Sequence, residues 1–363
     1  RGLGDVYKRQ EYHPGEIARI YSRYASAISV LCEPERFGGD YDHLQTVAQS
    51  THLPVLCKDF IVDPIQVYAA RYYGADAILL MMSIVDDHTY GELKALADRL
   101  GLDVLTEAIT EEEVNRAVGF GVDIIGINNR NLHDLSIDLG RTERLAQCIP
   151  SGKVIVSESG IRDNATVRRL GSHAHAFLVG SHLTSQRDID RAARDLVFGR
   201  NKVCGISTSS TAQAARAAGA RYGGLIFAPD SPRSVSRETA HHIVAAEPGL
   251  DYVAVTRSTD VNELKRLADI PGLHAFQLHA PFQGDLEGER QLLRRAREAA
   301  GSLDIWRAVN MREADFAALS GQPFSEVEAL VLDSGNGGTG TRFDWSTIPT
   351  EAVSYTHLTL PTT

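Results

Sequence analysis

The chain has 363 residues, which is long enough for about two domains, each with its own hydrophobic core. Its composition, 43% hydrophobic and 23% charged, is ordinary for a soluble globular protein. A net charge of -10 argues against nucleic acid or an anionic membrane as the main partner, although a local basic pocket could still bind a phosphate.

Four widely separated cysteines form no C-x-x-C pair, so they predict neither a zinc cluster nor a disulfide framework, and they fit a reducing cytoplasm. No set of His, Cys, Asp or Glu residues has the spacing of metal ligands, so we expect no metal, and no cofactor is implied. No apolar run reaches the ~18 residues of a membrane span, and the N-terminus lacks the apolar block of a signal peptide.

A helix expected over residues 14–25 opens a strict alternation of short β-branched runs and amphipathic stretches. The amphipathic stretches begin with helix-capping residues, as in "DPIQ" and "TEEE". Apolar strands that are each followed by a helix predict a parallel sheet covered by helices. The expected strands are residues 27–32, 54–60, 76–83, 103–108, 123–130, 154–160 and 176–183.

After a helix expected over residues 186–199, a second series of strands and helices begins. The fold class predicted is therefore α/β, with two tandem (βα)8 barrels, the first lacking its opening strand and the second its last two βα units. A doubly wound open sheet is the alternative, but neither half has G-x-G-x-x-G after an opening strand. The expected strands of the second series are residues 202–207, 222–227, 252–257, 274–280, 304–309 and 327–334.

The two ends of the chain have no periodicity that continues into their neighbours. We interpret residues 1–10 as a non-native lead and 354–363 as a non-native tail; native, flexible termini are the alternative. The expected domains are then a first barrel over residues 11–199 and an incomplete second barrel over 200–353.

Polar residues and glycines gather at the carboxyl ends of the first set of strands, where a βα barrel builds its active site. The stretch "PVLCKDF" is an apolar strand that ends on Lys58, and burying an ammonium group is costly unless it is paired or used. A lysine, two carboxylates, an amide and small-residue turns suit acid-base work on a phosphorylated substrate. These strand ends carry Lys58, Glu107, Asn128, Arg130, Glu158, Ser159, Gly160, Gly180 and Ser181.

Motifs in both halves resemble two enzyme families of tryptophan biosynthesis. "SAISVL", "LCKDF", "LTE", "GINNRNL", "SESGI" and "FLVGS" occur in the order and spacing of indole-3-glycerol-phosphate synthase. "KVCGI", "GLIF", "SPRSV", "QLH" and "LDSGNGGTG" are similar to those of phosphoribosylanthranilate isomerase. The order resembles that of the fused, bifunctional enzyme. The resemblance implies a monomeric protein that acts on small phosphorylated substrates derived from anthranilate.

The resemblance implies roles in the synthase half. Lys58 matches the general acid, which protonates the substrate carbonyl and then the departing hydroxyl, and Glu107 matches the general base. The substrate is 1-(2-carboxyphenylamino)-1-deoxyribulose 5-phosphate, which is closed and decarboxylated to indole-3-glycerol phosphate. The residues that match substrate-positioning groups are Asn128, Arg130, Glu158 and Ser159, and those that match the phosphate cradle are Gly160, Gly180 and Ser181.

The resemblance also implies roles in the isomerase half, which would rearrange N-(5-phosphoribosyl)anthranilate by an Amadori reaction. Cys204 matches the general base and Asp333 the general acid that such a rearrangement needs. Arg233 matches the group that faces the anthranilate carboxylate, and Gln277 and His279 are expected in the pocket.

Some features depart from the family pattern. No lysine, glutamate or serine of the family's opening strand has a match, and the chain stops before the last two strands of the isomerase barrel. "CGISTSSTAQAA" also has no Arg or Asp where the family usually places them, and Ala280 follows "QLH" where glycine is usual. A barrel that lacks strands exposes sheet edges and core, so we expect the chain as written to be poorly soluble or inactive.

Two alternatives to the bifunctional enzyme stay open at this point. One is a protein in which only the synthase half works and the isomerase half is degenerate, as the missing Arg and Asp suggest. The other is a non-catalytic pair of barrels that acts as a scaffold. Substitution of Lys58 and Glu107 distinguishes the scaffold from the enzyme, because only the enzyme would lose tryptophan synthesis.

Overall fold

The computed structural model describes residues 12–131, 134–310 and 326–333. The chain divides into two compact units, Arg1–Gly199 and Arg200–Thr363. The expected lead and tail, residues 1–10 and 354–363, lie outside the described residues, and so does most of the "LDSGNGGTG" motif.

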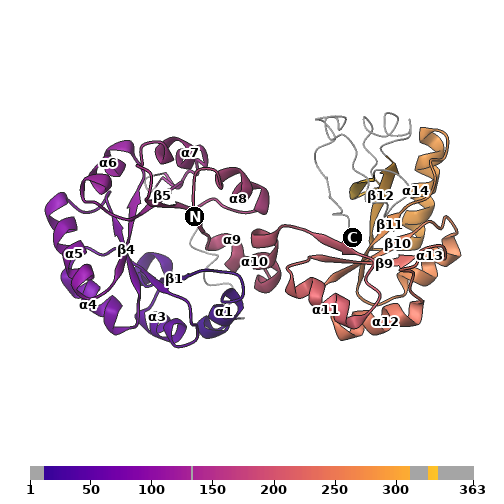
Figure 1. The fold of residues 1–363 in the computed structure, drawn as a ribbon, viewed down its shortest axis with the longest axis horizontal. Coiled ribbons are helices and arrows are strands. Elements are labelled where there is room, and N and C mark those ends of the chain that lie inside the picture. The colour runs from indigo at the N-terminus through magenta and orange to yellow at the C-terminus, as the bar shows by residue number, and fades with distance from the viewer. Residues whose placement is uncertain (1–11, 132–133, 311–325, 334–363) are drawn as a thin grey trace. The chain divides into compact units, whose positions relative to one another are not determined.

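The first unit is built around a parallel sheet of seven described strands, which pair in the order of the chain. Figure 1 shows these strands at the centre of a ring of helices. Among the described residues β1 and β7 are the outer strands of the sheet. The strands are β1 (Ile28–Leu31), β2 (Val55–Lys58), β3 (Ala77–Met81), β4 (Asp103–Ala108), β5 (Ile124–Asn128), β6 (Val154–Glu158) and β7 (Ala176–Leu178).

Helices alternate with these strands and cover the sheet. Asp63, Asp86, Thr110 and Asp163 each cap the helix that follows by accepting a hydrogen bond from a backbone N–H, as the sequence predicted. The helices are α1 (Pro14–Tyr21), α2 (Pro34–Phe37), α3 (Tyr41–Ala48), α4 (Pro64–Tyr72), α5 (Asp87–Arg99), α6 (Glu111–Gly119), α7 (Gly140–Ala146), α8 (Asn164–Leu170), α9 (Ser181–Thr184) and α10 (Ile189–Phe198).

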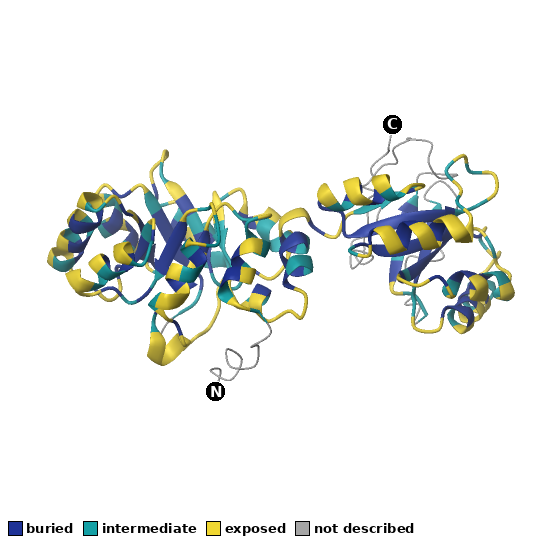
Figure 2. Ribbon diagram, turned by 90° about the horizontal axis from the view of Figure 1, so that it is seen from below, coloured by how far each residue is buried: buried dark blue, intermediate teal, exposed yellow. Residues whose placement is uncertain are grey.

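The core of the first unit lies between the sheet and the helices. Residues 104–108 of β4 and 125–128 of β5 are buried without interruption, because a strand that is covered on both faces alternates between two apolar layers. Figure 2 shows the buried strands inside and the exposed residues on the outer sides of the helices. On the helix layer, Tyr24 after α1 donates a hydrogen bond to Asp190 of α10 (2.8 Å), so the first and last helices of this unit are joined.

The second unit repeats the pattern with six described parallel strands. The strands are β8 (Lys202–Cys204), β9 (Tyr222–Phe227), β10 (Asp251–Thr256), β11 (Leu273–Leu278), β12 (Asp304–Asn310) and β13 (Ala329–Asp333). The helices are α11 (Ser209–Ala217), α12 (Arg237–Ala246), α13 (Val261–Ala268) and α14 (Leu286–Ala300). Its core includes the fully buried Tyr252, Phe276 and Leu293.

The prediction of an α/β fold with two tandem barrel-type units is confirmed, and each expected strand is found at its place in the chain. Residues 176–183 differ from the expected single strand. The strand ends at Leu178, and a helical turn begins at Ser181, because Gly180 between them takes a conformation outside the β region (φ -115°, ψ -84°). In the described part of the chain, no helix is long and apolar enough to cross a membrane.

Candidate active sites

The end of β2 holds the lysine that the sequence singled out. Three residues of β2 are buried, and the fourth, Lys58, keeps 24% of its side chain exposed. Its ammonium nitrogen lies 3.1 Å from the Glu158 carboxylate and 3.7 Å from that of Glu107. The buried strand therefore ends on a lysine because two carboxylates pair with its charge.

The two carboxylates come from the same rim of the sheet. Glu107 lies near the end of β4 and Glu158 is the last residue of β6, and both side chains are buried. Asn128, the last residue of β5, donates a hydrogen bond from Nδ2 to the Glu107 carboxylate (3.0 Å). Parallel strands that end at one edge thus bring together four side chains that are far apart in the sequence.

The charges and the burial of this cluster shift the pKa values of Glu158 and Lys58. Burial raises the pKa of Glu158 to about 7, with the Glu107 charge adding to the effect and the Lys58 charge opposing it. Burial acts to lower the pKa of Lys58, but the two carboxylates outweigh it and raise that pKa. Lys58 is therefore an ammonium group at neutral pH, and its neighbour Glu158 exchanges a proton near neutral pH.

One oxygen of Glu158 lies directly over a glycine. Within the described ranges, Glu158 Oε1 is buried and has no hydrogen-bond partner. A Cβ atom on Gly126 of β5 would lie only 2.2 Å from this oxygen, so any larger residue there would push the carboxylate away. Gly126 was not among the site residues predicted from the sequence, although its place two residues before Asn128 put it on the same face of the strand.

The turn after β6 has an unusual backbone. Ser159 has φ 66° and Gly160 has φ 80°, so two successive residues adopt the left-handed conformation. A Cβ atom on Gly160 would lie 2.5 Å from the Ile137 side chain, which makes glycine the residue that fits. After the neighbouring strand β7, Gly180 is the N-cap residue of α9 and Ser181 is its first residue.

The Arg130 side chain is directed to the loop after β5, and only the Arg130 backbone contacts the Lys58 cluster. Its guanidinium donates to the carbonyl of Leu135 (3.4 Å) in the loop that follows β5, and its backbone N–H donates to the Asn128 side chain (2.9 Å). Of the sequence-predicted residues of the first unit, the structure thus joins Lys58, Glu107, Asn128 and Glu158 by direct contacts.

In the second unit, Cys204 ends β8 and is half-buried. The guanidinium of Arg233 donates to the Cys204 carbonyl (3.2 Å). Gly205 follows the cysteine with φ 86°, and a Cβ atom there would lie 2.7 Å from the guanidinium. The glycine therefore allows Arg233 to reach across the end of the strand.

Gln277 and His279 lie at the end of β11 and touch each other. The Nε2 atoms of the two side chains are 2.6 Å apart. Burial lowers the pKa of His279 to about 4, and the charges of Lys202, Arg307 and Arg257 add to this effect. A neutral imidazole can accept a hydrogen bond, so the amide of Gln277 is the donor.

Asp333 is the last residue of β13, which lies at the other edge of the described sheet from β8, the strand that carries Cys204. The strand order places β13 and β8 as the outer strands of this six-stranded sheet. Asp333 pairs in register with Asn310 of β12. The carboxyl ends of the strands share one rim. Cys204 and Asp333 lie on this rim at the two outer strands of the described sheet.

A buried ion pair is hydrogen-bonded to the backbone on both sides of His279 and stabilises this segment. Arg307 of β12 makes two hydrogen bonds of 3.0 Å to Glu289 of α14, and both side chains are buried. The same guanidinium donates to the carbonyls of Leu278 (3.2 Å) and Ala280 (2.7 Å). This pair was not predicted from the sequence, because a charged residue inside a strand does not reveal its partner. Within the described ranges, no group of three His, Cys, Asp or Glu residues is arranged to hold a metal ion.

Comparison with known proteins places both units in families. The family model for indole-3-glycerol phosphate synthase matches residues 5–196, and that for N-(5'phosphoribosyl)anthranilate (PRA) isomerase matches residues 201–361. The chain is 59% identical over 342 residues to the tryptophan biosynthesis protein TrpCF of Corynebacterium glutamicum, with 94% of this chain and 72% of that protein covered.

Two further relatives carry the same name. The TrpCF protein of Salmonella typhi is 44% identical, with 93% of this chain and 73% of the relative covered. That of Yersinia pestis is 43% identical, with 95% and 70% covered. The chain therefore belongs to the TrpCF family of tryptophan biosynthesis proteins, with a unit of the indole-3-glycerol phosphate synthase family followed by one of the N-(5'phosphoribosyl)anthranilate isomerase family.

Proposed function

We propose that this protein catalyses two reactions of tryptophan biosynthesis, and that its first unit is the indole-3-glycerol-phosphate synthase. The observation that carries the proposal is the ammonium of Lys58, held 3.1 Å from Glu158 and 3.7 Å from Glu107 at the carboxyl ends of three parallel strands. Ring closure of 1-(2-carboxyphenylamino)-1-deoxyribulose 5-phosphate releases carbon dioxide and water, so it needs an acid and a base on one face of the substrate.

Lys58 is the proton donor in this proposal. As the carboxylate-bearing ring carbon attacks the substrate carbonyl, Lys58 gives a proton to the carbonyl oxygen. The carboxylate then leaves as carbon dioxide, its bonding electron pair returns to the ring, and a second proton lets the former carbonyl oxygen leave as water. Glu107 accepts a proton from the newly closed ring so that the aromatic indole forms. Glu158, with a pKa of about 7 and an oxygen 3.1 Å from the ammonium, is suited to restore the proton of Lys58 between the two donations.

The substrate phosphate would bind at the turns after β6 and β7. Two left-handed residues, Ser159 and Gly160, turn the backbone at the first of these places, and Gly180 and Ser181 begin a helical turn at the second. Small residues with accessible backbone N–H groups are typical of anion sites in barrels of this kind. Asn128, Ser159 and Glu158 would then face the ribulose hydroxyls and the anthranilate ring.

The second unit is the isomerase in this proposal, and its domain extends over residues 200–353, after a synthase domain over residues 11–199. Cys204 takes the C2 proton and Asp333 opens the ribose ring of N-(5-phosphoribosyl)anthranilate. Arg233, which lies against the Cys204 backbone, would face the planar anthranilate carboxylate. Gln277 and His279 would line the pocket.

The proposal is tested by assaying the purified full-length protein on each substrate separately. We expect indole-3-glycerol phosphate from the first substrate and the rearranged ribulose phosphate from the second. The variant Cys204→Ser should lose the second reaction and keep the first, and the matched variant Cys148→Ser should keep both. If the protein converts only the first substrate, the isomerase half is degenerate. If it converts neither substrate, the hypothesis of a non-catalytic scaffold is the one that remains.

We also propose that the protein acts in the cytoplasm as a monomer. The four cysteines are free thiols, which suits a reducing compartment. Fractionation of cells and gel filtration of the purified protein test the two parts of this proposal.

A further inference from the structure

Asn129 follows the end of β5 and points away from the Lys58 cluster. Successive residues of a strand face opposite sides of the sheet. Asn128 accordingly reaches Glu107 in the site, whereas Asn129 is turned to the other side and is fully buried. A buried amide needs partners for its two N–H groups and its oxygen, and those partners reveal what it holds in place.

The Asn129 amide is hydrogen-bonded on both of its ends. Its Nδ2 donates to the carbonyls of Glu158 (3.0 Å) and Ser159 (3.2 Å) and to the Ser157 hydroxyl (3.1 Å). Its Oδ1 accepts from the hydroxyl (2.8 Å) and the backbone N–H (3.3 Å) of Thr142. The hydroxyls of Thr142 and Ser157 are 2.7 Å apart, which closes a small buried network.

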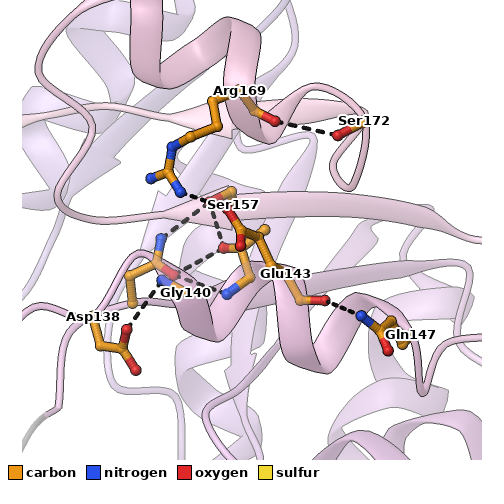
Figure 3. Close-up of polar contacts among 9 residues, drawn as sticks. Asp138, Gly140, Glu143, Gln147, Ser157, Arg169 and Ser172 are labelled. Atoms are coloured by element: carbon orange, nitrogen blue, oxygen red, sulfur yellow. Dashed lines mark hydrogen bonds and ion pairs between the residues drawn. The ribbon is translucent and has the colours of Figure 1, made fainter. Parts of the chain in front are cut away.

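Helix α7, which carries Thr142, is itself tied down, as the close-up in Figure 3 shows. The Asp138 carboxylate accepts from the N–H of Gly140 at the start of the helix (3.0 Å). Glu143 pairs with Arg169 of α8 (2.5 Å). The hydroxyl that fixes the Asn129 oxygen therefore sits on a helix that is held at two further points.

The two carbonyls that Asn129 holds belong to the turn after β6. In a trans peptide the C=O and the following N–H point in opposite directions. An amide that binds the carbonyls of Glu158 and Ser159 from the helix side therefore directs the N–H groups of Ser159 and Gly160 away from that side. Among the described residues, neither of these N–H groups donates a hydrogen bond. Both are thus available to an anion.

We propose that Asn129 is a positioning residue for the anion cradle of the synthase unit: its amide binds the carbonyls of Glu158 and Ser159 and thereby aims the N–H groups of Ser159 and Gly160 at the substrate phosphate. The proposal rests on the synthase function proposed above. It assigns Asn129 a role in binding the phosphate that it performs without touching the substrate.

The test is the variant Asn129→Asp in the full-length protein. Aspartate has the same size, but its carboxylate offers no N–H to the two carbonyls and places an oxygen against them. We expect the KM of the synthase substrate and the inhibition constant of inorganic phosphate to rise together by at least tenfold, and kcat to fall by a smaller factor. A residue that only stabilises the fold would change neither constant in the folded protein.

Two comparisons make the result specific. Asn164 also donates from Nδ2 to two carbonyls, those of Leu196 (2.9 Å) and Val197 (3.2 Å), so Asn164→Asp is a matched change outside the cradle and should leave both constants within twofold. Thr142→Val removes the hydroxyl that holds the Asn129 oxygen and should raise both constants severalfold, whereas Thr142→Ser keeps the hydroxyl and should restore them.

The outcomes separate this inference from the proposed function. If the unsubstituted protein does not convert the synthase substrate, the proposed function fails. If it does, and folded Asn129→Asp keeps both constants within twofold, the inference is wrong. If Asn129→Asp does not fold, Thr142→Val decides, and unchanged constants in that variant overturn the proposal. Binding of phosphate without competition against substrate would also overturn it.

Discussion

The ammonium of Lys58 lies 3.1 Å from the carboxylate of Glu158, although 100 residues separate them in the chain. The contact joins the ends of β2 and β6, which are not neighbours in the sheet, so it spans the interior of the first unit. Burial favours the neutral form of Glu158 and the ion pair favours its charged form, and the balance leaves its pKa at about 7. A lysine and a carboxyl group in this relationship can pass a proton at neutral pH.

Removing the ammonium group or the neighbouring carboxylate should slow the synthase reaction strongly and spare the isomerase reaction. We expect Lys58→Ala and Glu107→Gln each to lower the synthase kcat by about 10²- to 10⁴-fold, the usual contribution of a positioned acid or base. Steady-state kinetics of both reactions provide the measurement. Lys94→Ala is the control, since Lys94 makes a surface pair with Asp98 (2.8 Å). Near-normal synthase turnover in Lys58→Ala would contradict the assignment.

Filling the space above Gly126 should displace Glu158. In Gly126→Ala the new Cβ would start 2.2 Å from Glu158 Oε1, so the carboxylate must leave the position in which it pairs with Lys58. We expect at least a tenfold loss of synthase kcat and about 1–3 kcal/mol of stability, as is usual for overpacking. Gly119→Ala is the control, because a Cβ atom on Gly119 would meet nothing within 4 Å. Equal activities of the two variants would show that the glycine is not needed.

The low pKa of His279 predicts an acid-sensitive second unit. The folded pKa is about 4 against 6.5 in the unfolded chain, so the unfolded state binds a proton first as pH falls. The contribution of His279 to the free energy of unfolding is therefore fully present above pH 6.5 and is lost as the pH falls toward 4. This loss amounts to up to about 3 kcal/mol.

Tryptophan fluorescence measures this effect, because both tryptophans of the chain, including the buried Trp306, belong to the second unit. Urea unfolding between pH 4 and pH 7 should show a smaller decline in His279→Gln than in the unsubstituted protein. His88→Gln is the control, since the His88 side chain is 80% exposed. An identical pH dependence in all three proteins would refute the prediction.

Breaking the buried ion pair between Arg307 and Glu289 should destabilise the second unit. Glu289→Gln leaves a buried guanidinium without its carboxylate, and we expect a loss of about 3–5 kcal/mol in the free energy of unfolding. Glu298→Gln, which breaks an exposed pair with Lys265 (3.7 Å), should cost less than about 1 kcal/mol. Urea unfolding at pH 7 compares the two. If both variants lose a similar free energy of unfolding, burial does not increase the contribution of the Arg307–Glu289 pair to stability.

Much of the fold could be predicted from local patterns. Apolar runs of four to eight residues separated by capped amphipathic stretches indicate βα units, because a strand covered on both faces must be apolar throughout. The strands were placed correctly for this reason. The pattern failed at residues 176–183, where the strand expected from the apolar run 176–179 was extended through Gly180 into the helical turn that begins at Ser181. A continuous apolar run does not reveal whether its backbone changes direction.

The sequence by itself determined which residues stand at the rim of the first unit, since the last residues of parallel strands share one edge. Only the tertiary structure decided which of them touch. In the folded protein Lys58 lies between Glu158 and Glu107, the Arg130 guanidinium donates to the loop carbonyl of Leu135, and the Asn129 side chain points toward α7. Such contacts depend on strand register, on the face to which each side chain points and on the space its neighbours leave, and these are properties of the packed sheet that no local stretch of sequence contains.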